Sequence, residues 1–148
     1  MSQQKIVSAQ GIIHAPAAKV FDLIADPARQ PEWDGNANLS SAELGQRVRT
    51  VGEVFTMELT NDQVRQNHVV EFEQNRLIAW KPSAVGQPQP GHLWRWELEE
   101  DDDGHTVVTH TYDWSELDDP QRLKRAQATS EQMLEASIAR LRELAEDR

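Results

Sequence analysis

A chain of 148 residues with no cysteine and a formal net charge of −10 has the size of one domain. The absence of cysteine excludes disulfides, thiolate nucleophiles, zinc–thiolate sites and iron–sulfur clusters. The excess of 25 Asp and Glu over 15 Lys and Arg argues against a nucleic-acid-binding surface.

The hydropathy pattern is that of a folded domain with a modest core, to which five tryptophans add apolar area. No run of 18 apolar residues occurs, so we expect no segment that spans a membrane. The first residues carry no apolar stretch after their charge, so we expect no secretory signal and a cytoplasmic protein.

The beginning of the chain predicts one strand followed by two short helices. Residues 5–14 combine β-branched pairs with no helical stripe, which is typical of a strand. A helix then opens with Pro16 at its first position, where the missing N–H costs nothing. Pro27 ends this helix, and Asp26 caps a second short turn that Pro31 stops.

Six further strands and one long helix follow. The expected strands are residues 39–44, 53–60, 64–73, 77–81, 92–99 and 106–114. Asp119 and Pro120 cap and start a final helix that runs to about Glu146. This order predicts an α+β domain with a meandering antiparallel sheet of about seven strands.

The last hairpin gives the sharpest inference, because its loop determines which side chains share a face. Residues 102–104 suit a three-residue loop with Gly104 in the left-handed conformation, so that Asp101 faces His105. This register pairs Leu98 with Val108, Trp96 with His110, Trp94 with Tyr112 and His92 with Trp114 on one face. The other face carries Arg95, Glu97, Glu99, Thr109, Thr111 and Asp113. Such alternation indicates one buried and one solvated face.

The final helix is amphipathic and is expected to cover the aromatic face of this hairpin. Its apolar stripe contains Leu123, Ala126, Met133, Leu134, Ile138, Leu141, Leu144 and Ala145. Ser130 and Ser137 lie near the centre of the stripe, where a tightly packed helix would carry leucine. Small hydroxyl residues there predict an incompletely filled interior. The alternative is that both serines bond to the preceding turn and let the helix approach a strand closely.

The residues after the first strand carry a family pattern. Residues 13–35 read IHAPAAKVFDLIADPARQPEWDG, in which the marked positions are Ala15-Pro16, Val20-Phe21, Asp26-Pro27 and Trp33. With the order of elements, this resembles the START-like (SRPBCC) superfamily, nearest to its polyketide cyclase/dehydrase and lipid-transport group. The resemblance implies a single domain over residues 1–148 with a helix-grip fold. In that fold, a curved antiparallel sheet wraps around a long C-terminal helix and encloses an elongated apolar cavity.

The resemblance carries over no catalytic residue, so the polar candidates come from the pattern alone. His92, His110 and Tyr112 lie on the inner face of the predicted hairpin. The inner side of strand 64–73 is expected to comprise Val64, His68, Val70 and Phe72. A histidine in an apolar pocket can orient a carbonyl or move a proton near neutral pH, and a tyrosine hydroxyl can donate to a ligand oxygen. The alternative is a buried histidine satisfied by a backbone carbonyl or a hydroxyl.

We expect no metal site, no cofactor and no known catalytic motif. His105 and His110 are an odd number of residues apart, so one strand directs them to opposite faces. Neither a Gly-x-Ser-x-Gly nucleophile motif nor a glycine-rich phosphate loop occurs. The acidic run 99–103 is interpreted as a solvated hairpin tip, with a calcium site as the alternative. Residues 82–91 form either a plain connector or a flap over the cavity mouth.

Three functions are consistent with this pattern. The first is a carrier or sensor that binds a small hydrophobic molecule such as a lipid, polyketide or isoprenoid. The second is a cyclase or dehydratase with His110, His92 or Tyr112 as catalytic residues, and the third is a protein-interaction or stress-response module. The predicted ligand-binding residues are His68, Phe72, Trp94, Trp96, Leu98, Val108, His110, Tyr112, Ser130, Leu134, Ser137 and Leu141. We expect a monomer or homodimer without nucleic acid or membrane insertion.

Overall fold

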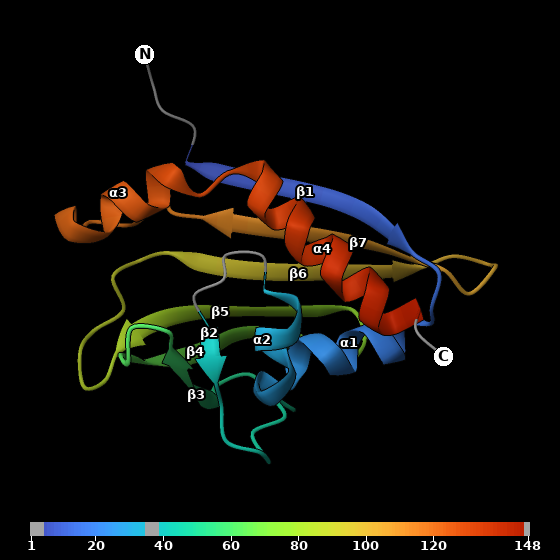
Figure 1. The fold of residues 1–148 in the computed structure, drawn as a ribbon, viewed down its shortest axis with the longest axis horizontal. Coiled ribbons are helices and arrows are strands. Elements are labelled where there is room, and N and C mark those ends of the chain that lie inside the picture. The colour runs from blue at the N-terminus through green and yellow to red at the C-terminus, as the bar shows by residue number, and fades with distance from the viewer. Residues whose placement is uncertain (1–4, 35–38, 147–148) are drawn as a thin grey trace.

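Seven antiparallel strands form one curved sheet in the order β1-β7-β6-β5-β4-β3-β2 (Figure 1). The computed structural model describes residues 5–34 and 39–146, so Gly35 of the sequence pattern lies outside the described residues. The strands are β1 (Ile6–Ile13), β2 (Leu39–Ser41), β3 (Val54–Leu59), β4 (Val64–Glu73), β5 (Leu77–Ala84), β6 (Leu93–Glu100) and β7 (Thr106–Asp113). β2 to β7 form the predicted meander, and β1 pairs with β7.

The helices lie in two groups on one side of the sheet (Figure 1). After β1 come α1 (Ala17–Ala25), the 3-10 helix η1 (Pro27–Arg29) and α2 (Gln30–Trp33). The chain ends in α3 (Pro120–Ala128) and α4 (Glu131–Glu146), and α4 contacts β1, α1 and α2. This arrangement confirms the predicted helix-grip fold. Pro16 stands one residue before α1, and its carbonyl accepts from the backbone N–H groups of Lys19 and Val20.

The prediction of one continuous C-terminal helix is wrong, because the helix is interrupted at Thr129 and Ser130. The exposed Ser130 is the residue before α4, and its Oγ accepts from the Met133 backbone N–H at 3.3 Å. Adjacent hydroxyl residues favour such an N-cap over a helix interior, because their side chains compete for backbone hydrogen bonds. Ser130 therefore does not lie on a buried stripe.

The last hairpin has the predicted loop and register. The Asp101 backbone N–H donates to the His105 carbonyl at 2.8 Å, and Gly104 has a φ of +78°. The ladder pairs Leu98 with Val108, Trp96 with His110 and Trp94 with Tyr112, as predicted. It ends at the pair of Leu93 and Asp113, so His92 and Trp114, which are both buried, lie just beyond it.

A β-bulge in β4 leaves Phe72 on the predicted inner side and reverses the side of the residues just before the bulge. Val69 lies opposite Trp80 and Glu71 opposite Ala79, so Val70 is the extra residue between them. The sequence prediction alternated inner and outer residues back from Phe72 without an extra residue. It therefore assigned the residues before Val70 to the wrong face. His68 lies opposite the exposed Val54, and its Nε2 is 2.9 Å from Ser83 Oγ. The prediction that His68 faces the interior is wrong, and its neighbour Asn67 takes the inner position.

The interior near the hairpin tip is solidly packed. Its core includes Ile13, Phe21, Leu98, Val108, Leu134, Ile138 and Leu141, with Phe72 against it. A Cβ atom on Gly11 would lie 2.9 Å from Ile138 Cγ2, which shows how closely α4 approaches β1. Ser137 is buried one residue before Ile138, so its small size accompanies the close approach of α4 to β1.

Candidate functional site

A cavity of about 790 Å³ lies between the sheet and the helices, at the end of the sheet away from the β6–β7 hairpin tip. It is bounded by β3 to β7, by α2 and by the junction between α3 and α4, which contributes Ala128, Thr129 and Met133. In Figure 1 this end of the sheet lies near α3, whereas the hairpin tip points the opposite way. The hollow is thus displaced from the centre of α4.

Aromatic side chains form one wall of the cavity. Its large apolar side chains are Trp33, Leu39, Met57, Leu59, Trp80, Trp94, Trp96 and Tyr112. The ring centroids of Trp94 and Tyr112 are 4.2 Å apart, and those of Trp96 and His110 are 3.7 Å apart with the rings nearly parallel. Directly opposed side chains on antiparallel strands meet in this way, so the hairpin register creates the wall.

His110 is the most unusual polar residue of the wall. It is 3% exposed, and neither ring nitrogen has a hydrogen-bond partner among the described residues. Burial lowers the pKa of His110 to about 3, because the imidazolium would lose its hydration. At neutral pH the ring is therefore uncharged and offers one donor and one acceptor. The alternative of a histidine satisfied by a carbonyl or hydroxyl does not describe this ring.

The remaining polar lining lies around the aromatic wall. Asn67 is buried on β4, and the Gln30 side chain donates from Nε2 to the Ile24 carbonyl at 3.2 Å. Arg122 and Asp119 form an ion pair at 3.2 Å beside the cavity. The Gln30 amide and the Arg122–Asp119 pair thus interact with the protein itself. Asp34, Gln63 and Arg65 also contribute polar or charged groups to the lining.

Four of the twelve predicted ligand-binding residues line the cavity: Trp94, Trp96, His110 and Tyr112. His92, a catalytic candidate, also lines it. Phe72, Leu98, Val108, Leu134, Ser137 and Leu141 belong to the packed end, and His68 and Ser130 lie elsewhere. The lining residues that the sequence reasoning missed come mainly from α2 and from β3 to β5. The alternation of side chains along the strand could have identified Trp80 as an inner residue. The inner position of Asn67 depends on the bulge in β4, which the sequence pattern does not reveal.

The segment 82–91 begins as strand and then passes the cavity. β5 continues to Ala84 because it pairs with β4 as far as that residue. Its pairing with β6 ends at Trp80, so Pro82 removes no ladder bond on that side. Val85 lines the cavity. Gly91 has a φ of +118°, and a Cβ there would lie 2.2 Å from the Glu116 carbonyl oxygen. The end of this segment is therefore packed against the link between β7 and α3.

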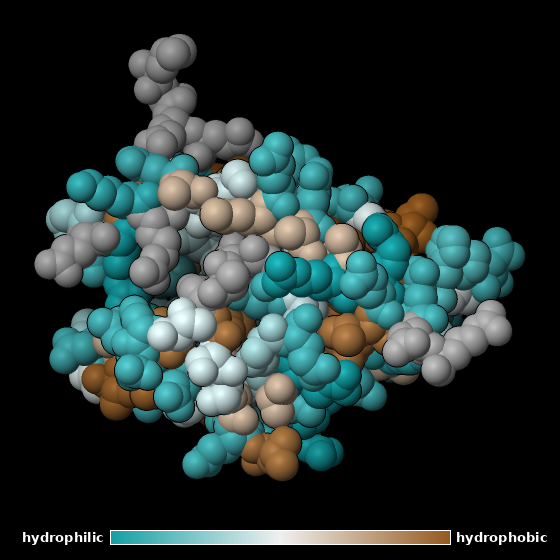
Figure 2. Space-filling model, viewed as in Figure 1, coloured by the Kyte–Doolittle hydropathy of each residue, from teal (hydrophilic) through white to brown (hydrophobic). Residues whose placement is uncertain are grey.

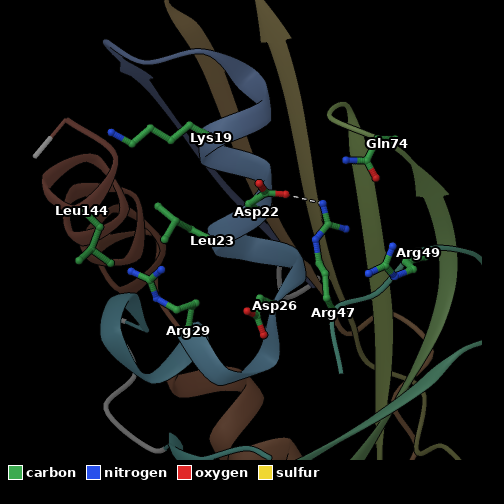
Figure 3. Close-up of a pocket in the computed structure, with 9 residues that line it drawn as sticks. All are labelled: Lys19, Asp22, Leu23, Asp26, Arg29, Arg47, Arg49, Gln74 and Leu144. Atoms are coloured by element: carbon green, nitrogen blue, oxygen red, sulfur yellow. Dashed lines mark hydrogen bonds and ion pairs between the residues drawn. The ribbon is translucent and has the colours of Figure 1, made fainter. Parts of the chain in front are cut away.

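A second groove, of about 710 Å³, lies on the outside of α1 (Figure 3). Charged side chains dominate its lining, which comprises Lys19, Asp22, Leu23, Asp26, Arg29, Arg47, Arg49, Gln74 and Leu144. Figure 3 shows Arg47 directed at Asp22, and this ion pair measures 2.5 Å. Arg29 pairs with Glu32. This groove has no aromatic wall, so the cavity under the sheet is the candidate site.

The face of the molecule in Figure 2 has no large hydrophobic patch on which another protein could dock. There, hydrophobic residues form small separate patches among hydrophilic ones.

Within residues 5–34 and 39–146, no group of three or more His, Asp or Glu side chains could hold a metal ion. No helix of the same residues is long and apolar enough to cross a bilayer.

The fold and the cavity define a helix-grip protein with an aromatic-walled cavity between the sheet and the helices. Residues 4–146 match the family described as polyketide cyclase / dehydrase and lipid transport, and the chain belongs to this family. The expected membership of the polyketide cyclase/dehydrase and lipid-transport group is confirmed.

Similar proteins extend this assignment without adding an activity. The uncharacterized protein Rv0088 of Mycobacterium tuberculosis (strain H37Rv) is 32% identical over 105 residues, which cover 69% of this chain and 44% of that protein. The chain thus spans less than half the length of the curated relatives it matches.

Solved structures with low sequence identity share the fold. Protein MLL2253 from Mesorhizobium loti has a TM-score of 0.69 at 17% identity, covering 94% of this chain and 95% of that one. DynU16, from the dynemicin biosynthetic locus, has a TM-score of 0.68 at 16% identity, covering 98% and 48%. The Aha1 dimer from Colwellia psychrerythraea has a TM-score of 0.67 at 16% identity, covering 97% and 98%.

Proposed function

We propose that this protein binds a small hydrophobic molecule in the cavity under the sheet, as a carrier or sensor. The observation that carries the proposal is the aromatic wall around a cavity of about 790 Å³. Small-molecule sites have volumes of about 300–1,000 Å³ and are mostly apolar with a few polar groups. Burial of apolar ligand surface would contribute about 25 cal/mol per Å². The family description, which includes lipid transport, supports the same function.

Native mass spectrometry and tryptophan fluorescence test this proposal, because four tryptophans line the cavity. The protein is purified from a host that contains apolar metabolites and then titrated with a panel of lipids and aromatic hydrophobes. We expect a bound mass above that of the bare chain and a fluorescence change with at least one compound. Ala84→Phe, which adds a ring to the cavity lining, should weaken binding about tenfold or more, since about 1.4 kcal/mol corresponds to a factor of ten.

The matched control is Ala18→Phe, because Ala18 is exposed on α1 and does not line the cavity. This variant should bind as the wild type does. A bare-chain mass together with no fluorescence response across the whole panel would contradict ligand binding.

A cyclase or dehydratase is the second candidate, supported by the family description and by His92, His110 and Tyr112 in the lining. With a pKa of about 3, the His110 imidazole carries no extra proton at neutral pH. It would therefore polarise a carbonyl by hydrogen bonding and would not act as a general acid. Recovery of an unchanged ligand after incubation favours the carrier, and recovery of a cyclised or dehydrated product favours the enzyme.

A further inference from the structure

The side-chain amide of Asn67 is buried in the cavity lining and has no partner in the part of the chain that the structure describes. Asn67 as a whole is 6% exposed. Its Oδ1 and Nδ2 atoms nevertheless keep accessible area, because the fully enclosed unpartnered atoms belong to other residues, His92, Trp96, His110 and Trp114. Since Asn67 points to the inner face of β4, the space that its amide reaches is the cavity.

The surroundings of Asn67 on the sheet offer its amide nothing to bond. The residue lies opposite Phe55 on β3 and opposite Pro82 on β5, and the next inner residue of β4 is Val69. None of these three side chains has a hydrogen-bonding group. Native proteins satisfy almost all buried polar groups with protein, water or ligand. The amide therefore marks the point where a polar group of the ligand would contact the sheet.

The amide specifies what this group must offer. A carboxamide presents an N–H donor and a carbonyl acceptor side by side in one plane. A ligand group with an N–H beside a carbonyl matches both atoms at once, as in a lactam or a primary carboxamide. A ketone, ester or ether offers acceptors alone, and a hydrocarbon offers neither atom a partner.

The neighbouring rings favour a flat ligand at the same point. Phe55, which lies opposite Asn67, meets Trp80 edge to face with ring centroids 5.4 Å apart. Aromatic rings of a ligand pack well against such a surface. Arg65 also lines the cavity, and it donates to Gln63 Oε1 at 3.2 Å. A ligand carboxylate directed at Arg65 is therefore the competing complement, and the experiment includes it.

We propose that Asn67 is a specificity-determining residue that selects flat hydrophobic ligands with an N–H group beside a carbonyl, such as aromatic lactams and carboxamides. This inference deepens the ligand binding proposed above and rests on it. A ligand without this pair of atoms leaves the amide without its partners, so it should bind about tenfold or more weakly.

Four probes of similar shape test the selectivity: 2-quinolinone, N-methyl-2-quinolinone, naphthalene and 2-naphthoate. Each is titrated into the wild type by isothermal titration calorimetry, with competition in native mass spectrometry. We expect 2-quinolinone to bind at least about tenfold more tightly than the N-methyl compound, which keeps the carbonyl and lacks the donor, and than naphthalene. Equal affinities, or tightest binding of 2-naphthoate, would overturn the inference while leaving ligand binding intact.

A matched pair of variants assigns the preference to Asn67. Asn67→Leu removes the amide and keeps the size, so it should abolish the preference and retain the affinity for naphthalene. Gln66→Leu makes the same kind of change at the next residue, which does not line the cavity, and should keep the preference. An unchanged preference in a folded Asn67→Leu protein would overturn the assignment.

Thermal unfolding of the ligand-free proteins gives an independent measurement. Asn67→Leu should raise the melting temperature by about 3–5 °C, because it removes a buried polar group that lacks a partner. A lower melting temperature, or a variant that does not fold, would show that the fold itself needs the amide and would overturn the inference. Binding of panel compounds without 2-quinolinone would overturn it as well, whereas no binding of any probe or panel compound would overturn the proposed function.

Discussion

The uncharged state of His110 links its position to the behaviour of the folded protein in acid. The ring has an ordinary pKa of 6.5 when solvated, and burial lowers this pKa to about 3 in the folded chain. Between these values the unfolded chain binds a proton that the folded chain does not. The free energy of unfolding therefore falls as the pH falls through this window, and the full stability is present above pH 6.5.

His110→Phe should remove this acid sensitivity. On lowering the pH from 7.5 to 5, we expect the wild type to lose about 2 kcal/mol more unfolding free energy than the variant. Urea unfolding at the two pH values measures the difference, and the other histidines cancel because both proteins contain them. Parallel losses in the two proteins would show that His110 titrates normally.

For single residues, the alternation of side chains along the strands and the length of one loop were sufficient to predict a common inner face. That face carries Trp94, Trp96, His110 and Tyr112. The unpartnered state of the His110 and Trp96 nitrogens was not predictable, because it depends on Trp33, which packs from α2. Residues far apart in the chain decide whether a buried donor finds a partner.

The contact between α4 and β1 determines what the small residues of α4 do. The helix passes so close to Gly11 that a Cβ there would lie 2.9 Å from Ile138 Cγ2, and Ser137 is buried one residue earlier. The sequence interpretation associated Ser137 with a hollow, whereas the alternative of close approach describes the packing. Helical periodicity identified the face of α4, but the distance of that face from the sheet depends on which strand it crosses.

Ser137→Leu should therefore destabilise the fold. Three additional carbon atoms in a packed region cost about 1–3 kcal/mol through displaced side chains. Ala139→Leu makes a comparable change on the exposed side of the same helix and should alter the unfolding free energy by at most about 0.5 kcal/mol. Chemical denaturation measures both variants. A stabilised Ser137→Leu protein would show that space exists beneath α4.

The interruption between α3 and α4 was missed for a related reason. An apolar stripe can be drawn through Ser130 if the helix is assumed to be continuous, and a serine in that stripe suggests a cavity. Its hydroxyl instead accepts the Met133 N–H, and Ala128, Thr129 and Met133 around the interruption line the actual cavity. The hollow exists, but a break in the helix helps to form it, and amphipathic periodicity carries no information about such a break.

The whole molecule is divided into a packed end near the hairpin tip and an open end under α3. A hydrophobic ligand at the open end would contact both the sheet and the helices, so binding should stabilise the fold as a unit. The order of elements and the family pattern were sufficient to predict the sheet, the helical cover and the existence of a cavity. They could not place the cavity along the sheet, because its position depends on helix interruptions and on the β4 bulge.

A bound ligand should raise the melting temperature. At a free concentration one hundred times the dissociation constant, binding adds about 2.7 kcal/mol to the unfolding free energy. For a chain of this size, this corresponds to a shift of roughly 5–10 °C. Differential scanning calorimetry measures the shift, which Ala84→Phe should reduce. A compound that native mass spectrometry shows bound, yet that leaves the transition unmoved, would not be occupying the interior.

The single extra residue at Val70 has a consequence for the design of insertions and deletions in β4. Removing Val70 would join Val69 to Glu71, and regular pleating would still direct Val69 and Phe72 inward, opposite Trp80 and Ile78. Removing one residue between Val64 and Asn67 instead would turn the preceding part of the strand over. The strand should therefore tolerate the loss of one residue at the bulge but not a few residues before it. In an aligned sequence, each of the two changes is a gap of one residue within the same strand.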